Sequence, residues 1–268
     1  MREICIGAGG SAKVYRIWQE KEQQFVVEKR SRSSLYWEAF WMQKLKGLAV
    51  PECYGVARKG EFWIIQMEYL TGRTLMEWIW SGELDGLARI LVMKSMVKEL
   101  QKIRERIPGI VLCDIKPSNL IVSYQYEVRF IDFGSVTQKG HKKRCLGTKP
   151  YAAPEVTKGN PGEKSDIYSV GWIMWTLHEK RKDFFYYYII WPCIRKRIAK
   201  RTGNLNRIYQ RLVIMEQRER WNKISKKYVP KYILLPGLVW ILINVRKGQG
   251  DILKTVLEKF FHFVTVFF

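Results

Sequence analysis

Cysteine and histidine are scarce in this sequence of 268 residues, and those present lie far apart. There are three histidines and an odd number of cysteines, namely Cys5, Cys53, Cys113, Cys145 and Cys193. Without a C-x-x-C pair, this pattern indicates neither a disulfide framework nor a zinc site, and it suits a reducing compartment. No histidine stands at a ligand or triad spacing, so a metal hydrolase or a cysteine protease has little support.

Acidic residues are few compared with basic ones. Asp and Glu number 25 against 47 Lys and Arg, which gives a formal net charge of +22. Such a charge attracts nucleic acid, anionic lipid or acidic protein surfaces and does not choose among them. The chain does not open with the cationic segment, apolar run and cleavage site of a signal peptide, so we expect a cytoplasmic protein.

A long apolar run that could span a bilayer is also missing. The nearest candidates lie in the C-terminal tail, residues 232–268, and one of them is interrupted by Pro236 and Gly237. Neither reaches the roughly 18 to 20 apolar residues that a spanning helix needs. Basic residues flank these runs and would suit an anionic membrane face. Two interpretations stay open: the tail attaches to the cytoplasmic face of a membrane, or it packs on the rest of the protein.

Apolar residues are plentiful, at 47% of the chain, so a sizeable core is expected. Four polar side chains capable of chemistry lie within twenty residues: Asp114, Lys116, Asn119 and Asp132. Carboxylate and amide oxygens suit a hard cation such as magnesium. Each motif alone also fits an ordinary turn. Together they are what a reaction between a hydroxyl and a magnesium-bound triphosphate requires.

The spacing D-x-K-P-x-x-N, followed by D-F-G, resembles the catalytic loop and metal-binding motif of protein kinases. The resemblance implies an α+β fold with two lobes, a small β-rich N-lobe and a mainly helical C-lobe. It implies that Asp114 orients the attacking hydroxyl and that Lys116 steadies the transferring phosphoryl group. Asn119 and Asp132 would bind Mg²⁺, and ATP would be the phosphoryl donor.

A glycine-rich turn near the start of the chain extends the resemblance. On its own, such a turn is more often a plain hairpin, but it matches the kinase loop G-x-G-x-x-G-x-V except that Ala12 replaces the third glycine. Backbone amides in such a turn can approach phosphates closely. The resemblance implies ATP contacts from Gly7, Ala8, Gly9, Gly10 and Val14.

Lys29 ends the next predicted strand and resembles the kinase lysine that pairs with the ATP phosphates. Glu38 is its expected partner, on a helix that Ser33 or Ser34 can cap. The connection from Lys29 to Glu38 is short, so this helix or its preceding loop is shortened. Val27 replaces the small alanine of the family and is predicted to narrow the adenine pocket.

The apolar segment 62–72 is predicted to be a buried strand that runs into a turn. It resembles the strand and hinge that join the two kinase lobes. The resemblance implies that Met67 guards the adenine pocket and that the backbone from Glu68 to Leu70 meets the adenine edge. We therefore predict an N-lobe at 1–67, the hinge and C-lobe at 68–231, and the tail at 232–268.

The resemblance continues beyond the catalytic motifs. The sequence Ala153-Pro154-Glu155 resembles the kinase A-P-E turn, whose glutamate pairs with a later arginine, and Arg220 is our candidate for it. Asp166 resembles the aspartate that braces the catalytic loop. The basic segment 135–146 is typical of an activation segment. Residues 184–197 are aromatic and then basic; packed aromatics with a solvated basic face explain them better than nucleic-acid binding.

We predict a serine/threonine protein kinase similar to compact bacterial members of the eukaryotic-like group, because Lys116 and Thr148 favour hydroxyl amino acids other than tyrosine. The alternative is a pseudokinase, a nucleotide-binding or scaffolding module without turnover. A small-molecule kinase is a weaker rival, since such enzymes generally lack the A-P-E turn. The protein substrate and the oligomeric state are not indicated by the sequence.

The usual His-Arg-Asp of kinases is replaced here by Leu112-Cys113-Asp114. The arginine that would receive a phosphate from the activation segment is therefore absent. Our hypothesis is that phosphorylation of Ser135 or Thr137 does not switch activity through that contact. Leu112 also removes a polar brace behind Asp132, which would lower the rate without abolishing it.

Overall fold

The computed structural model describes residues 3–9, 12–138 and 147–228, without the side chains of 225–228. The chain divides into two compact units, Met1–Glu216 and Gln217–Phe268. Only the end of helix α6 is described in the second unit, whereas the first contains the predicted site residues. The C-terminal tail, for which we predicted membrane attachment or packing, lies outside the described residues. Among the described residues, no helix is both long and apolar enough to cross a membrane.

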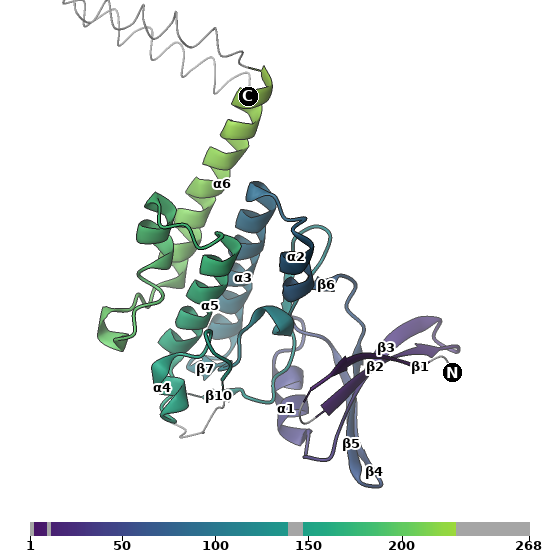
Figure 1. Ribbon diagram of the computed structural model, residues 1–268. Coiled ribbons are helices and arrows are strands. Elements are labelled where there is room, and N and C mark those ends of the chain that lie inside the picture. Colours follow the sequence, from purple (N-terminus) through teal and green to yellow (C-terminus); the bar gives the residue numbers. More distant parts are fainter. Residues whose placement is uncertain (1–2, 10–11, 139–146, 229–268) are drawn as a thin grey trace, which may run out of the picture. The chain divides into compact units, whose positions relative to one another are not determined.

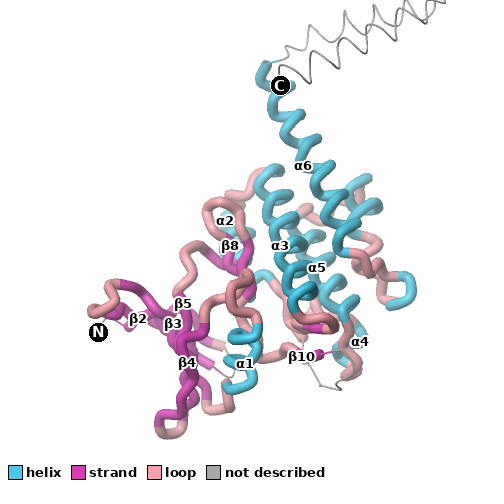
Figure 2. The backbone as a smooth tube through the Cα atoms, turned by 180° about the vertical axis from the view of Figure 1, so that it is seen from behind, coloured by secondary structure: helices cyan, strands magenta, loops and turns pink. Residues whose placement is uncertain are grey.

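A five-stranded antiparallel sheet forms the first part of the chain, in the order β1-β2-β3-β5-β4 (Figure 1). The strands are β1 (Glu3–Ala8), β2 (Ala12–Gln19), β3 (Gln24–Ser31), β4 (Cys53–Lys59) and β5 (Phe62–Glu68). Helix α1 (Tyr36–Lys44) lies between β3 and β4 in the sequence and beside the sheet in Figures 1 and 2. The buried side chains of Val26 and Ile65 belong to the two central strands.

The second part is mainly helical, as Figure 2 shows from behind. Its helices are α2 (Leu75–Ser81), α3 (Gly86–Arg106), α4 (Pro154–Thr157), α5 (Glu163–Leu177) and α6 (Leu205–Tyr228). Short strands form two small sheets, β6 (Arg73–Thr74) with β8 (Leu120–Val122) and β9 (Val128–Phe130), and β7 (Ile110–Val111) with β10 (Thr137–Gln138). Single turns lie at Pro117–Asn119, Tyr186–Ile190 and Ile198–Lys200. The predicted α+β fold with two lobes is confirmed.

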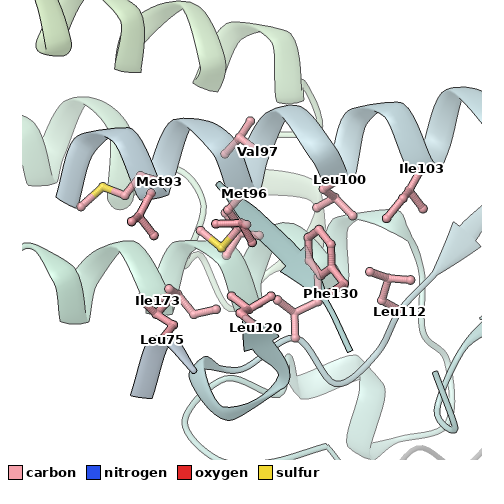
Figure 3. Close-up of a cluster of buried hydrophobic side chains, with 14 of the residues drawn as sticks. Leu75, Met93, Met96, Val97, Leu100, Ile103, Leu112, Leu120, Phe130 and Ile173 are labelled. Carbon is pink, nitrogen blue, oxygen red and sulfur yellow. The ribbon is translucent and has the colours of Figure 1, made fainter. Parts of the chain in front are cut away.

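Helix α3 supplies the centre of the helical core (Figure 3). Met96 and Leu100 are fully buried and lie near Ile173 of α5 and Phe130 of β9 in the same cluster. Burying each such side chain contributes about 1.5–3 kcal/mol. Asp85 caps this helix by accepting a hydrogen bond from the Ala88 N–H at 2.8 Å.

The predicted cap of α1 is wrong. The helix begins after Leu35, which is buried and provides no side-chain cap, although the Ser34 hydroxyl accepts a weak bond from the Tyr36 N–H. The backbone carbonyl of Leu35 instead accepts the Ala39 N–H at 3.0 Å. Packing of Leu35 against the core therefore sets where this short helix begins.

The hinge after β5 depends on one glycine. Gly72 has a φ of +137°, and a Cβ atom there would lie 2.5 Å from the Val122 carbonyl oxygen. Only glycine fits such a close approach to another backbone. The chain is thereby able to pass tightly against β8 as it enters the helical part.

Candidate active site

The loop that carries Asp114 follows the short strand β7 and is braced from below by helix α5. Asp166 is fully buried, and its carboxylate accepts the backbone N–H groups of Leu112 and Cys113, each at 3.0 Å. Cys113 has a φ of +69°, a left-handed conformation that costs about 1 kcal/mol or more. The predicted bracing role of Asp166 is confirmed, since its two hydrogen bonds hold this strained backbone in place.

Asp114 lies at the centre of a hydrogen-bond network made by neighbours in its own loop. Lys116 Nζ lies 2.7 Å from Asp114 Oδ2, and the Asn119 amide nitrogen donates to Asp114 Oδ2 at 3.1 Å and to its carbonyl at 3.0 Å. The turn Pro117–Asn119 makes these contacts possible by folding the chain back on itself. Three of the predicted site residues are thus brought together.

Thr148 joins this network from a segment 32 residues beyond Lys116. Its hydroxyl donates to Asp114 Oδ1 at 3.2 Å and accepts from Lys116 Nζ at 3.1 Å. The sequence suggested Thr148 only as a mark of specificity and did not place it among the site residues. The signal was its position just before the A-P-E turn.

A second network joins three segments of the chain around Lys29. Its Nζ lies 2.8 and 2.9 Å from the two carboxylate oxygens of Glu38 and 3.1 Å from Asp132 Oδ1. Strand β3 carries the lysine and α1 carries Glu38, so the short connection between them still delivers the glutamate to the lysine. Glu38 is buried, whereas the Asp132 side chain is 41% exposed.

Burial and charge oppose one another at these three groups. Burial disfavours the charged form of Lys29, but the Glu38 and Asp132 carboxylates outweigh it and raise the lysine pKa. Burial raises the Glu38 pKa, against the attraction of Lys29. Burial also acts to raise the Asp132 pKa, but Lys29 overcomes it, so this pKa lies below the usual aspartate range. One cation thus faces two carboxylates, which leaves an excess of negative charge beside Asp132.

The pairing of β8 with β9 brings Asp132, which follows β9, close to Asn119, which precedes β8. The Ile131 N–H donates to the Asn119 carbonyl at 2.9 Å, which places the two loop ends side by side. Asp132 has a φ of +70°, and the Gly134 N–H donates to its Oδ1 at 3.3 Å. A left-handed aspartate of this kind is uncommon and is typical of functional turns.

These side chains fit Mg²⁺ by the chemistry of their free atoms. The Asn119 amide nitrogen is used by Asp114, so its oxygen is the atom that can face a cation, and the Asp132 carboxylate reaches solvent. Among the described residues, no three acidic, histidine or cysteine side chains gather into a closed metal site. An open oxygen site suits Mg²⁺, which usually completes its shell with water and substrate phosphates.

The glycine-rich turn joins β1 and β2. Gly7 lies opposite Val14 in the β1–β2 register, and the Gly9 N–H donates to the Ala12 carbonyl at 2.9 Å. Ala8 ends β1 at this turn. Gly10 lies outside the described residues, so its predicted ATP contact stays a prediction.

The predicted adenine-contacting residues line up across two strands. Val27 and Met67 are directly paired in the β3–β5 register and both are buried, and Leu70 is buried beyond the end of β5. The Glu68 N–H already donates to the Glu52 carbonyl at 2.9 Å. Any adenine contact by the Glu68 backbone must therefore use its carbonyl oxygen.

The side chain of Glu68 has a separate structural task. Its carboxylate accepts two hydrogen bonds of 2.7 Å from the Arg129 guanidinium. Burial acts to raise the Glu68 pKa, but Arg129 lowers it below the usual glutamate range. This bidentate pair fastens the hinge to β9, which leads into Asp132.

The arginine partner of Glu155 is Arg201, so our assignment of Arg220 is wrong. The Arg201 guanidinium pairs with the Glu155 carboxylate and also donates to the carbonyls of Arg195 and Lys164. A short loop separates Arg201 from α6, and Asn204 caps the first turn of that helix by accepting the Arg207 N–H. That cap was a usable signal, because it marks Arg201 as a loop residue just ahead of a helix.

Two predictions that follow from the unusual catalytic loop concern Leu112 and Thr137. Leu112 is buried beside Phe130 and Ile103, so apolar packing occupies the place of the expected polar brace (Figure 3). Thr137 is 3% exposed and lies in β10, paired with Val111. The basic residues 139–146 of the predicted activation segment lie outside the described residues.

Comparison with known proteins places the chain in a family. A sequence model described as "Protein kinase domain" matches residues 2–229. The chain therefore belongs to the protein kinase family.

Among similar curated proteins are bacterial serine/threonine-protein kinases. A probable serine/threonine-protein kinase of Streptomyces coelicolor is 29% identical over 67% of this chain and 30% of its own length. The serine/threonine-protein kinase PrkC of Bacillus subtilis is 30% identical over 49% of this chain and 21% of its own. The serine/threonine-protein kinase PknL of Mycobacterium tuberculosis is 28% identical over 64% of this chain and 47% of its own length. The chain thus spans less than half the length of these relatives.

Proposed function

We propose that this protein is an ATP-dependent serine/threonine protein kinase. The observation that carries the proposal is the convergence of two networks from separate segments. One joins Lys29, Glu38 and Asp132, and the other centres on Asp114 and includes Thr148. These are the positions that the family uses for phosphate binding and for the attacking hydroxyl.

Asp114 orients the substrate hydroxyl and accepts its proton as the oxygen attacks the γ-phosphorus of ATP, whose bond to the β–γ bridging oxygen breaks so that ADP leaves. Lys116 lies 2.7 Å from Asp114 and places a positive charge beside the phosphoryl group as it is transferred, which stabilises the negative charge of that group. The Thr148 hydroxyl holds Asp114 Oδ1 in one orientation until the substrate hydroxyl takes the place of the threonine hydroxyl. Positioning of this kind supplies most of the rate enhancement in phosphoryl transfer.

Lys29 binds the ATP phosphates that are not transferred, and the ion pair with Glu38 holds the lysine ammonium in position. Asn119 and Asp132 would hold Mg²⁺ through their oxygens. The metal, when bound, neutralises phosphate charge and orients the triphosphate. The glycine-rich turn donates backbone N–H groups to the phosphates, while Val27, Met67 and Leu70 enclose the adenine.

The test is phosphate transfer by the purified chain with ATP and Mg²⁺, read by mass spectrometry on the protein itself and on a generic basic protein. We expect phosphoserine or phosphothreonine, and its loss in Asp114→Ala and Asp132→Ala. Lys59→Ala, an exposed change on β4, is the matched control and should keep full activity.

Retention of ATP binding without phosphate transfer would overturn the proposal in favour of a pseudokinase. Phosphate transfer that persists in Asp114→Ala would equally contradict the assigned role of Asp114. The predicted boundaries, 1–67, 68–231 and 232–268, remain predictions from the sequence. So do the two interpretations of the tail, attachment to an anionic membrane face or packing on the rest of the protein.

A further inference from the structure

A pocket outside the candidate active site lies on the helical part, beside α5. It has a volume of about 480 Å³ and is lined by aromatic side chains, two of them buried, and by basic side chains that are mostly exposed. Tyr168, Trp172 and Trp175 come from α5, and Tyr186 and Trp191 come from the following turns. None of the proposed catalytic steps uses this pocket.

The rim of the pocket is positively charged. Its charged lining residues are Arg195, Lys196, Arg197 and Lys200, and none of the described residues that line it is acidic. The Arg195 guanidinium lies 4.4 Å from the centre of the Trp191 ring, which holds this cation over the aromatic wall. A ligand that fits must therefore offer negative charge at the rim and an apolar group inside.

The loop that carries the rim is held rigidly. Arg201 donates to the carbonyls of Arg195 and Lys196 while its guanidinium pairs with Glu155 of the A-P-E turn. The Lys164 ammonium donates to the Ile198 carbonyl at 3.2 Å. These bonds pre-form the basic rim, and a pre-formed rim loses less entropy when it binds a partner.

The inner wall of the pocket packs directly on the catalytic loop. Tyr168 belongs to a buried cluster with Cys113, the residue before Asp114, and with Ala153 of the A-P-E turn. Trp172 and Ile194 pack against the same cluster. The pocket and the loop that carries Asp114 therefore share one packed layer of side chains.

We propose that this pocket docks an acidic segment of the protein substrate, with one aromatic or aliphatic side chain inserted between Trp172 and Trp191. The inference rests on the proposed kinase function and names a substrate class for it. Charge complementarity favours an anionic chain, because four basic residues adjoin the aromatic wall, and the proposed kinase function makes a protein segment the expected anionic chain. Docking here would raise the local concentration of the substrate hydroxyl near Asp114.

The first arm of the test measures binding to the full chain by fluorescence anisotropy. The probe is a fluorescein-labelled peptide of aspartate and glutamate around a single phenylalanine. We expect Lys196→Glu/Arg197→Glu to weaken binding about tenfold or more. The matched control, Arg58→Glu/Lys59→Glu on exposed β4, changes the net charge equally and should leave binding unchanged.

Two further comparisons separate docking from general attraction to a basic protein. Replacing the phenylalanine of the probe by serine, or its acids by their amides, should each weaken binding. Trp191→Ala, a change at a residue 36% exposed, should reproduce the loss of the apolar contact without unfolding the protein. Equal weakening in both charge-reversal variants would overturn the proposal.

The second arm measures phosphorylation of a serine peptide with and without the acidic segment attached. The Lys196→Glu/Arg197→Glu variant should raise KM about tenfold for the acidic form only, with kcat unchanged. Binding without any phosphorylation would overturn the kinase function but not the pocket. A single-stranded oligonucleotide that displaces the peptide and binds more tightly would overturn the assignment of a protein ligand.

Discussion

Two ion-pair networks in this protein use the same chemical groups in different ways. Around Arg201, the guanidinium is fully buried and its donors are taken by Glu155 and three backbone carbonyls. Around Lys29, one ammonium faces two carboxylates, and one of these, Asp132, is partly exposed to solvent. In the first network the protein itself supplies an acceptor for the arginine donors. In the second network the carboxylates outnumber the ammonium group, which leaves negative charge that a bound cation can neutralise. Completeness of pairing, rather than the presence of a salt bridge, separates a structural pair from a functional one.

The largest effect should come from breaking the incomplete network. Lys29→Met removes the charge that grips the phosphates, so we expect phosphorylation of a protein substrate to fall about 10³-fold. Lys59→Met, an exposed lysine on β4, is the matched control. Lys29→Met also leaves the buried Glu38 carboxylate without its cation, so the thermal midpoint is measured beside activity and the comparison is made where both variants are folded. Phosphorylation that persists in folded Lys29→Met would contradict the functional assignment.

Breaking the complete network should act on stability instead. Arg201→Met leaves the buried Glu155 carboxylate unpaired, and we expect the free energy of unfolding to fall by about 3–5 kcal/mol, measured by urea unfolding. Adding Glu155→Gln removes the stranded charge. The double variant should therefore be less destabilised than the sum of the single variants; strict additivity would show that the two side chains act independently.

The pair of Glu155 and Arg201 should contribute less to stability as the pH falls. Burial acts to raise the Glu155 pKa, but hydrogen bonds from Arg201 and Ser165 bring it below the usual glutamate range. Because the folded pKa is lower than the unfolded one, its stabilisation is complete above the ordinary value of about 4.3 and is lost as the pH falls through the folded value.

Urea unfolding across that acidic range can compare the two networks. Glu155→Gln should show a shallower loss of stability than the unsubstituted protein. Asp132→Asn should change the slope less, since solvent screens its 41% exposed carboxylate. Identical slopes for Glu155→Gln and the unsubstituted protein would rule out the pair as a source of acid sensitivity.

The smallest effect concerns the segment after Asp132. Since Cys113 occupies the place of the phosphate-receiving arginine and Thr137 is buried, Ser135→Ala/Thr137→Val should keep activity within about twofold. Steady-state phosphorylation of a protein substrate checks this. A fall of orders of magnitude would show that the segment is switched by phosphorylation after all.

Local spacing predicted most of the candidate site. Asp114, Lys116 and Asn119 lie within six residues, so one turn is enough to bring them together. The pairing of Glu38 with Lys29 was also predicted, although a shortened connection made the geometry hard to foresee. The N-cap of α1 was predicted wrongly, because packing of Leu35 overrode the preference of serine for that position.

The sequence by itself determined the residues of the catalytic motifs and the resemblance to the kinase family, because these depend on short spacings, and that resemblance implied the two-lobed fold. Only the tertiary structure decided that Arg201 rather than Arg220 pairs with Glu155, and that Thr148 joins Asp114. It also assembled the basic and aromatic pocket beside α5 from segments that the sequence shows only as a row of similar residues. Contacts between distant segments depend on how helices and loops pack, and no local spacing encodes that packing.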